Sequence, residues 1–381
     1  MDFAWSKNQK DLKEAAVKFA ESKLNDKFIE KEERGEFSYQ GWKACADFGL
    51  QGMLIPKAYG GMELNPLDIV AVLEGIGYGC RDSGLLFSIN AHIWACELPI
   101  YHFGTEEQKQ KYLPGLCQGQ SIGANAMTEP DSGSDVYGLR TTATEEKDGF
   151  VLNGSKMFIT NAPVADLFVV YARSGASKGF SGITCFIIEK GTEGLMVGKE
   201  FKKMGLRTSP MSDVAFQQCR VPKNNVVGKI GSGAIIFSDS MEWERTFILS
   251  YCIGVMERQW EACLKYAKLR KTGEKPIGKQ QAVANKIVEM RVRLETSRLI
   301  LYKAAWLKNI KKSAVTDSAI AKLYVSEAYV NNMRDAVQIF GGYGYMVEYG
   351  LERELRDALA STIYSGTSEI QKNIIGAFSG L

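Results

Sequence analysis

Three charged side chains stand where a strongly apolar stretch of the sequence begins. The segment DSMEWERTFILSYCIGV contains Glu242, Glu244 and Arg245 just before its apolar run. A carboxylate enclosed by apolar groups has a raised pKa, which suits a general base that works near neutral pH. A carboxylate near the start of a helix is also stabilised at a plain surface by the helix dipole, so the residue types alone leave both roles open.

Helical periodicity does not choose between the two glutamates. Residues two positions apart differ by about 200° around an α-helix, so only one of Glu242 and Glu244 can face an enclosed site. Glu244 shares its stripe with Ile248 and Tyr251. Glu242 shares another stripe with Leu249. Both stripes are apolar, and the pattern therefore leaves the choice open.

Two further stretches carry groups that could hold a flat or phosphorylated ligand. The polar turn in AMTEPDSGSD contains Thr128, Gly133 and Ser134, whose hydroxyl and backbone N–H groups can bind a phosphate or the polar edge of a ring. The strand-like run MFITN puts Phe158 and Thr160 on one side, an aromatic plane beside a hydroxyl. Ordinary surface turns and strands carry such groups too, so neither stretch alone identifies a ligand.

Motifs for several other chemistries are missing from the sequence. His92 and His102 have no cluster of carboxylates near them along the chain, which favours a structural role for each over a metal site or a catalytic triad. The glycine-rich run GGYGYMVEYG matches neither a dinucleotide fingerprint nor a P-loop. The eight cysteines are scattered without a C-x-x-C pair, so we expect neither a disulfide framework nor a zinc ribbon. This cysteine pattern fits a protein of the reducing cytoplasm.

The pattern of apolar and polar residues changes twice along the chain, which predicts three domains in the order α, β, α. At 381 residues the chain is long enough for about two or three domains. Residues 1–120 show helical spacing, residues 121–232 contain short β-rich runs separated by glycine and charged turns, and residues 233–381 return to long helical patterns. We therefore expect a mainly α fold with a central β domain.

The charge balance and the lengths of the apolar runs limit which kinds of partner the protein can bind. A net charge of +3 and a pI of about 8.3 come without the concentrated basic stripe of nucleic-acid-binding proteins. A weakly positive face would still suit an acidic partner protein. The charged start MDFAWSKNQKDLKEAAVKF has no apolar signal core, and no run approaches the roughly 18 apolar residues of a membrane span. We expect a cytoplasmic protein that binds neither nucleic acid nor membrane.

Five motifs resemble those of the acyl-CoA dehydrogenase family and occur in the same order. They are TEPDSGSD, KMFITN, KMGLRTSP, QIFGGYGY followed by RD, and IYSGTSEIQ, and together they span essentially the whole chain. The resemblance implies an N-terminal helical domain, a middle β-barrel-like domain and a C-terminal four-helix bundle. It also implies an oxidoreductase with FAD at domain and subunit junctions, usually assembled as a homotetramer.

The resemblance implies FAD contacts residue by residue, and it implies no metal site. Contacts to the flavin and the pyrophosphate are implied for Met127, Thr128, Gly133 and Ser134, with Phe158 and Thr160 beside the isoalloxazine ring and Thr160 near N5. Residues that resemble those holding the ADP half from a neighbouring subunit are Arg270, Gln281, Gln338, Gly341 and Gly342, and further FAD contacts are implied for Thr367 and Glu369.

One motif departs from the family pattern. Where the family commonly has R-x-x-F-G, this sequence reads RKTGE, so Gly273 replaces the aromatic residue and Glu274 replaces the glycine. The departure removes a packing contact, a change that could loosen the dinucleotide or the subunit interface.

The catalytic base is a feature in which members of this family differ. Acyl thioesters are oxidised by removal of an α proton while a β hydride passes to flavin N5, so the protein must supply a base. Many members place a glutamate just before G-T-S in the last motif, where this sequence has Ser365, whose neutral hydroxyl cannot serve unaided. Other members carry the glutamate before an arginine on the helix that opens the C-terminal domain, which corresponds to Glu244 before Arg245. The resemblance thus favours Glu244 as the base and leaves Ser365 a structural or oxyanion role, its backbone N–H polarising the thioester carbonyl together with a flavin ribityl hydroxyl.

Within the family, the sequence looks most like a subgroup that oxidises prolyl groups tethered to carrier proteins. The shared stretches are GYGCRDSGLLF, AHIWACELPIYHF, GANAMTEP, SMEWER followed by GVMERQ, and STIYSGTS. This resemblance implies oxidation of an L-prolyl thioester on an acyl or peptidyl carrier protein, in alkaloid biosynthesis, to a dehydroprolyl or 1-pyrroline-5-carboxyl thioester. Trp243 and Tyr251 could shape a pocket for the proline ring, although aromatic residues at helical spacing more often form core.

Other functions stay open on the sequence alone. A short- or branched-chain acyl-CoA dehydrogenase fits the five family motifs, because composition does not separate a carrier-bound thioester from a CoA thioester. An oxygen-inserting flavoprotein relative would not need Glu244, and a helical interaction protein would not need FAD. The final electron acceptor, oxygen or an electron-transfer protein, and the number of oxidations, one or two, are open as well.

Overall fold

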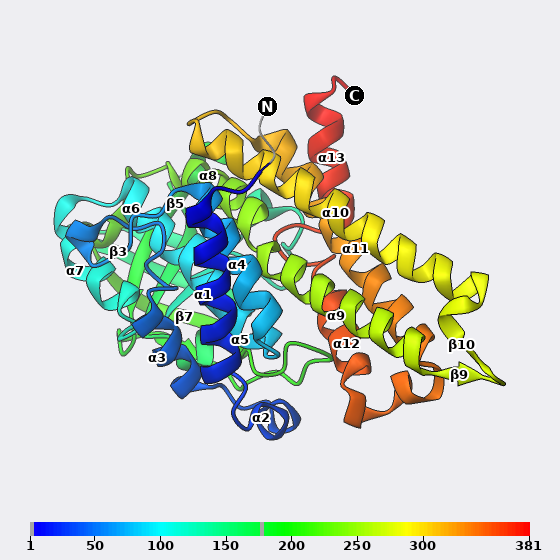
Figure 1. The fold of residues 1–381 in the computed structure, drawn as a ribbon. Helices are drawn as coiled ribbons and strands as arrows, with labels where there is room; N and C mark the ends of the chain where they lie inside the picture. The colour runs from blue at the N-terminus through cyan, green and yellow to red at the C-terminus, as the bar shows by residue number, and fades with distance from the viewer. Residues whose placement is uncertain (1–3, 176–178) are drawn as a thin grey trace.

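Figure 1 shows a central sheet flanked by N-terminal helices and by long C-terminal helices that extend away from it. The structure, a computed structural model, describes residues 4–175 and 179–381. The N-terminal α-helices are α1 (Lys7–Lys23), α2 (Phe28–Arg34), α3 (Tyr39–Phe48), α4 (Pro66–Gly79), α5 (Ser83–His92), α6 (Leu98–Phe103) and α7 (Glu106–Cys117).

Local sequence signals explain where several of these helices begin. Ser6 caps α1 by accepting a hydrogen bond from the backbone N–H of Gln9, whose side chain returns to the backbone N–H of Ser6. Asn65 caps α4, and Pro66 occupies its first position, where a missing N–H costs nothing. These capping groups satisfy backbone donors that no helical partner can reach.

A π-helical segment, η2 (Ile93–Glu97), interrupts the path from α5 to α6. Buried His92 fixes this segment: its Nδ1 accepts from the backbone N–H of Gly123 at 2.9 Å, and its Nε2 lies 2.9 Å from Glu97 Oε1. His102 pairs with Asp239 at 2.7 Å. Each histidine thus has a single carboxylate partner in space, and the described residues contain no group of three or more ligands that could hold a metal.

The middle part of the chain forms a mixed sheet. Its strands among the described residues are β1 (Gly123–Ala126), β2 (Thr142–Glu145), β3 (Gly149–Thr160), β4 (Leu167–Ser174), β5 (Ile183–Glu189), β6 (Leu195–Val197), β7 (Met211–Pro222) and β8 (Val226–Val227). The order is β6-β7-β3-β2-β4-β5-β8, and β1 pairs in parallel with β4, Gly123 opposite Leu167. Antiparallel β3 and β7 place Thr160 opposite Met211, so the end of β3 lies beside the start of β7.

Long helices return after the sheet. They are α8 (Gly233–Phe247), α9 (Ser250–Leu269), α10 (Gln281–Asn309), α11 (Val315–Phe340), α12 (Leu351–Ala360) and α13 (Ser368–Phe378). A small hairpin of β9 (Lys271–Thr272) and β10 (Lys275–Pro276) joins α9 to α10. Figure 1 shows this hairpin at the end of the long helices, on the side away from the sheet.

The apolar segment around Glu244 is not a single helix. The periodicity of its apolar residues predicts one continuous helix. Helix α8 ends at Phe247 and α9 begins at Ser250, with Ile248 and Leu249 buried in the turn between them. The run is apolar because this turn lies in the core, not because a single helical stripe continues. Because α8 already begins at Gly233, Glu244 lies in the last turn of a helix and not at its start.

Helices α4 and α9 touch at two glycines. A Cβ atom on Gly77 would lie 1.9 Å from the backbone oxygen of Tyr251, and a Cβ on Gly254 would lie 2.0 Å from the backbone oxygen of Glu74. Real Cβ atoms do not approach backbone this closely, so only glycine allows the contact. The contact holds the N-terminal helices against the C-terminal ones.

A buried ion cluster strengthens the same junction. Glu74 is fully buried, and its carboxylate accepts from Lys13 at 2.8 Å, from Arg298 at 2.6 Å and from the hydroxyl of Tyr302 at 3.0 Å. A buried carboxylate is tolerated only with such partners. Since the four residues come from α1, α4 and α10, the cluster is a structural joint.

The architecture confirms the predicted fold class, a mainly α chain with a central β part. One apolar core, which includes Trp42 and Phe247, is shared by N-terminal and C-terminal helices, and another, which includes Phe150, lies in the sheet. The predicted domain boundaries at 120 and 232 fall between α7 and β1 and between β8 and α8, and they stay a prediction. In the described ranges, no helix combines the length and the apolar character needed to cross a bilayer.

Candidate active site

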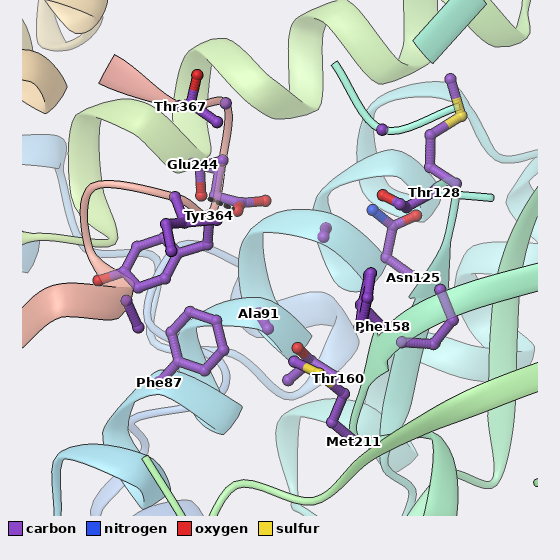
Figure 2. A pocket seen from close by; sticks show the side chains of 18 of the residues that line it. Phe87, Ala91, Asn125, Thr128, Phe158, Thr160, Met211, Glu244, Tyr364 and Thr367 are labelled. Atoms are coloured by element: carbon purple, nitrogen blue, oxygen red, sulfur yellow. Dashed lines mark hydrogen bonds between the residues drawn. The ribbon is translucent and has the colours of Figure 1, made fainter. Parts of the chain in front are cut away.

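A cavity of about 720 Å³ lies where the sheet, the N-terminal helices and the C-terminal helices meet. Its walls come from α5, η2, β1, β3, α8 and the turn between α12 and α13 (Figure 2). Nine of the predicted site residues line it: Met127, Thr128, Gly133, Ser134, Phe158, Thr160, Glu244, Ser365 and Thr367. Stretches more than 200 residues apart in the sequence therefore meet in one site.

Glu244 is the buried carboxylate of this cavity, with 7% of its surface exposed. Its Oε1 accepts a short hydrogen bond from the hydroxyl of Ser365. Burial raises the pKa of Glu244, while the Ser365 hydrogen bond and the charges of Arg245 and Lys322 oppose the rise. The group is thus a carboxyl whose proton affinity has been moved toward neutral pH.

The turn that carries Ser365 is held in an unusual conformation. Ser365 has φ +56°, a left-handed value that costs a serine about 1 kcal/mol, and Gly366 follows at φ +90°. The carbonyl of Ser365 accepts from Arg245 Nε and from Gln371 Nε2, each at 3.1 Å. Arg245 therefore fixes the turn of Ser365 and Gly366 beside the carboxylate of Glu244, the residue just before Arg245.

The structure shows which of the two glutamates faces the cavity, a choice that periodicity left open. Glu242 faces away from the cavity, where its carboxylate binds Lys308 at 2.6 Å and the backbone N–H of Ala314 at 2.7 Å. Trp243 stacks on Phe247 at 5.6 Å between centroids and does not line the cavity, so it is core, as aromatic residues at this spacing usually are.

Phe158 forms the opposite wall in a strained backbone conformation. It has φ +59°, and the pairing of β3 with β7 shifts register between Lys156 and Ile159. The irregularity turns the Phe158 ring into the cavity, where 61% of its surface is exposed, and Thr160 lines the cavity beside it. Strained residues concentrate at functional sites, and an exposed ring in a cavity is a surface for a flat ligand.

A buried ion pair that the sequence analysis missed supports this wall. Lys156 is fully buried, and its Nζ donates to the Met127 carbonyl at 3.0 Å and to Glu129 Oε1 at 2.8 Å. Burial lowers the pKa of Lys156 to about 8, and Lys156 in turn lowers the pKa of Glu129. The available signal was a lysine inside the strand run KMFITN, where a charge must find a partner.

Asn125 is a second site residue that the sequence analysis missed. It lies on β1 and lines the cavity, and its Oδ1 is buried without a hydrogen-bond partner among the described residues. A buried amide oxygen left unsatisfied costs about 1–3 kcal/mol, so a bound group with an N–H or O–H donor would be stabilised there. The signal was a polar residue two positions before Met127, on the same face of the strand GANAM.

The remaining predicted site residues lie outside the cavity. Arg270, Gln281, Gln338, Gly341, Gly342 and Glu369 are exposed. The first five group at the end of the helices that carries the β9–β10 hairpin, where the guanidinium of Arg270 lies 5.5 Å from the centre of the Tyr343 ring. Figure 1 shows this end far from the sheet, so within one chain these five residues are not brought to the cavity. Glu369 sits in the first turn of α13, just after Thr367, which caps that helix.

The two residues that depart from the family pattern occupy the turn of the hairpin. Gly273 has φ +61°, and Gly273 and Glu274 are both exposed between β9 and β10. A glycine takes this left-handed conformation without strain, which gives a local reason for glycine at this position.

Three family models match the chain in sequence order. They are "Acyl-CoA dehydrogenase, N-terminal domain" over residues 6–120, "middle domain" over 124–219 and "C-terminal domain" over 231–379. The chain belongs to the acyl-CoA dehydrogenase family. Membership confirms the predicted family and the predicted class, an oxidoreductase.

Individual relatives match over the full chain. An "L-prolyl-[peptidyl-carrier protein] dehydrogenase" from Serratia sp. (strain ATCC 39006) is 42% identical over 381 residues, 100% of this chain and 99% of that protein. The crystal structure of the prolyl acyl carrier protein oxidase AnaB has 47% identity and a TM-score of 0.97, covering 99% of this chain and 100% of AnaB. A structure of PigA with FAD and proline has 42% identity and a TM-score of 0.98, covering 100% of both chains. The resemblance to the prolyl-carrier-protein subgroup is thereby confirmed.

Proposed function

We propose that this acyl-CoA dehydrogenase family member is an FAD-dependent enzyme that oxidises the prolyl group of an L-prolyl thioester on a carrier protein. The observation that carries the proposal is a buried carboxylate, Glu244, across one cavity from the exposed ring of Phe158. The substrate class is supported by relatives whose names contain prolyl carrier proteins and which match along the whole chain.

The cavity residues fit a flavin. Phe158 offers an exposed aromatic face, Thr160 a hydroxyl beside it, and Asn125 a buried amide oxygen that needs a donor. An oxidised isoalloxazine ring presents a flat face together with one N–H donor, at N3, and polar edge atoms, so it matches this set. Met127, Thr128, Gly133, Ser134 and Thr367 line the same cavity and would hold the flavin and the adjoining phosphates. PigA, which has the same fold, is known as an FAD complex.

In the proposed reaction Glu244 removes the Cα proton of the prolyl thioester. Its raised pKa allows it to accept that proton near neutral pH, and the Ser365 hydroxyl keeps the carboxylate oriented. FAD, when bound, supplies the acceptor for the hydride that leaves Cβ, at N5. A Cα–Cβ double bond results, and the dehydroprolyl thioester can tautomerise to the 1-pyrroline-5-carboxyl thioester. The backbone N–H of Ser365 would polarise the thioester carbonyl as negative charge develops on its oxygen.

The end of the cavity suits a small acyl group. Phe87 and Tyr364 line it with ring centres 4.6 Å apart, and Ala91 lies between them and the sheet (Figure 2). Ala95, a second small residue, also lines the cavity. The space beside Glu244 thus accommodates a five-membered ring more readily than a long acyl chain. Tyr251 is buried core and does not line the cavity, so it is not part of this pocket.

We further propose that the protein is a homotetramer in which the exposed end of the helices completes the FAD site of a neighbouring subunit. Large apolar side chains are exposed there, including Tyr345, Val347 and Tyr349. Along α10, Val288, Val292 and Leu299 are also exposed at helical spacing. Exposed apolar surface of this kind is typical of subunit interfaces. The free, buried state of all eight cysteines supports the expected cytoplasmic location.

Anaerobic reduction of the flavin by prolyl-loaded carrier protein tests the proposal. We expect the wild-type flavin to bleach, and we expect Glu244→Gln to retain FAD but to bleach about 10²- to 10⁴-fold more slowly, because the general base is lost. Glu242→Gln is the matched control, since it changes a glutamate of the same helix that faces away from the cavity.

Two outcomes would contradict parts of this proposal. Unchanged bleaching in Glu244→Gln would refute the base. Faster bleaching by short- or branched-chain acyl-CoA thioesters than by the prolyl carrier would support a conventional acyl-CoA dehydrogenase instead. Mass spectrometry of the carrier-bound product, which should have lost two hydrogen atoms, distinguishes oxidation from simple binding.

A further inference from the structure

Lys322 is a buried amine that the proposed reaction does not use. It lies on α11, its exposed fraction is 0%, and its Nζ has no hydrogen-bond partner in the part of the chain that the structure describes. Burial, together with nearby Arg245, lowers the pKa of Lys322 to about 7. A buried amine without a hydrogen-bond partner is costly, so its presence here calls for a physical reason.

Helix α11 places Lys322 behind two segments: the end of α8 that carries Glu244, and the turn that carries Tyr364 and Ser365. One turn earlier, the hydroxyl of Ser318 lies 2.6 Å from that of Thr246, which is two residues after Glu244 on α8. Lys322 Nζ itself lies 5.9 Å from the centre of the Tyr364 ring, which lines the cavity. Lys322 therefore lies behind the carboxylate and the turn that contacts it, outside the cavity itself.

The other ionisable groups around this position are already engaged or uncharged. Arg245 donates to the Ser365 carbonyl, Glu327 accepts from the Ser368 hydroxyl at 2.6 Å, and Glu369 is exposed to solvent. The groups that stay neutral because their pKa values are raised are Tyr364, in the turn, and Cys96, on η2. The guanidinium of Arg245 and the amine of Lys322 are therefore the two sources of positive charge on this side of Glu244, and only the amine lacks a hydrogen-bond partner among the described residues.

We propose that Lys322 is a positioning residue whose positive charge, supplied from behind the cavity wall, keeps Glu244 in its carboxylate form. A cation close to a carboxyl favours the ionised state, and burial of Glu244 has the opposite effect. Without Lys322, Glu244 would hold its proton to higher pH and a smaller fraction would be ready to act as a base. The proposal rests on Glu244 being the base of the proposed function.

Two measurements on the FAD-loaded protein test it. The first is the infrared carboxyl band of Glu244, taken as the difference from Glu244→Gln and followed over pH without substrate. The second is the pH profile of anaerobic flavin reduction. In Lys322→Met we expect both midpoints to move up by about one unit or more, and Lys322→Arg, which keeps the charge, should retain most of the wild-type midpoint. Lys303→Met removes a positive charge at the surface, where 67% of the side chain is exposed, and should shift neither.

The outcomes separate this proposal from the function itself. An unchanged infrared midpoint in Lys322→Met, or slower reduction at every pH without a shift, would show a merely structural role and overturn it. If Lys322→Met does not fold, Lys322→Gln is measured by the same criteria. Failure of prolyl carrier protein to reduce the wild-type flavin, with the infrared shift still present, would count against the proposed substrate and not against Lys322.

Discussion

The two ends of the C-terminal helices differ in how much of a site one chain provides. At the cavity end, Glu244 is buried, bonded to Ser365 and close to Arg245 and Lys322, all from the same chain. At the hairpin end, the predicted FAD contacts are exposed, and the apolar surface around them includes Tyr345 at 80% exposure. The proposed proton-transfer groups therefore all come from one chain, while the hairpin end, where dinucleotide contacts are proposed, exposes apolar surface of the kind found at subunit interfaces.

Mixing two inactive chains is the strongest test of this difference. One chain carries Glu244→Gln, which disables its cavity, and the other carries Arg270→Ala with Gln338→Ala, which disables its hairpin end. If FAD sites are shared between subunits, co-expression creates some sites with both parts intact. For random pairing we expect recovery to about a quarter of the wild-type rate of flavin reduction, from a background at least tenfold lower.

The control for this experiment is a protein in which every chain carries all three substitutions. No intact site can form there, and activity should stay at background. If the mixed chains also stay at background while each still binds its partner, the site is complete in one chain and the comparison between the two ends is wrong.

Removing the Ser365 hydroxyl tests whether its hydrogen bond controls the pKa of Glu244 at the cavity end. In Ser365→Gly, Glu244 loses its hydrogen bond, and a bond to a charged group is worth about 1.5–3 kcal/mol. The pKa of Glu244 should rise further, since that bond favours the ionised form. Because only the carboxylate can accept a proton, reduction rises with pH through this pKa, so the rising limb should move to higher pH and the rate at pH 7 should fall about tenfold.

Comparison with Ser365→Ala separates the hydroxyl from the backbone. Both variants lose the hydrogen bond, but glycine adopts φ +56° freely, whereas alanine keeps the strain of about 1 kcal/mol. We expect the same shift of the pH profile in both and a loss of stability that is smaller in Ser365→Gly than in Ser365→Ala, by about the 1 kcal/mol of strain that glycine relieves. A shift in the alanine variant alone would mean that turn geometry, and not the hydrogen bond, controls Glu244.

Much of the fold could be predicted because it depends on patterns that repeat within short windows. Alternation in MFITN and the helical spacing of the flanking regions gave the α, β, α order. The break between Phe247 and Ser250 could not be seen, because a buried turn and a buried helix are equally apolar. The same ambiguity misplaced Glu244 near the start of a helix.

The candidate site was predictable where a motif names a residue, and not where a long-range contact defines its role. The family motif favours Glu244 over Glu242, but helical spacing does not, because Lys308 and Ala314, which hold Glu242, lie far along the chain. Lys156 was missed because its partners, Met127 and Glu129, lie in the loop after β1. Asn125 was missed because its Oδ1 has no partner among the described residues, which spacing does not reveal. Sequence spacing cannot report which buried polar atom is left unpaired.

The smallest expected effect lies at the hairpin, where Glu274 replaces the glycine of the family pattern. The segment KLRKTGEKPIGK carries five basic residues and this one acid, and the turn exposes Glu274 to solvent. If this end binds the phosphates of a neighbouring subunit's FAD, Glu274 repels them. Glu274→Gln should then tighten FAD binding by about two- to fivefold, since exposed charge pairs contribute about 0.2–1 kcal/mol.

Salt dependence decides whether this gain is electrostatic. At low ionic strength the repulsion reaches across the hairpin, whereas at 1 M salt screening within about 3 Å should remove the difference between Glu274→Gln and the wild type. Glu30→Gln, an exposed charge change on α2, should have no effect at either salt concentration. Equal FAD affinity for wild type and Glu274→Gln at all salt concentrations would mean that the hairpin turn does not face the dinucleotide, and the contrast between the two ends would then rest on the apolar surface alone.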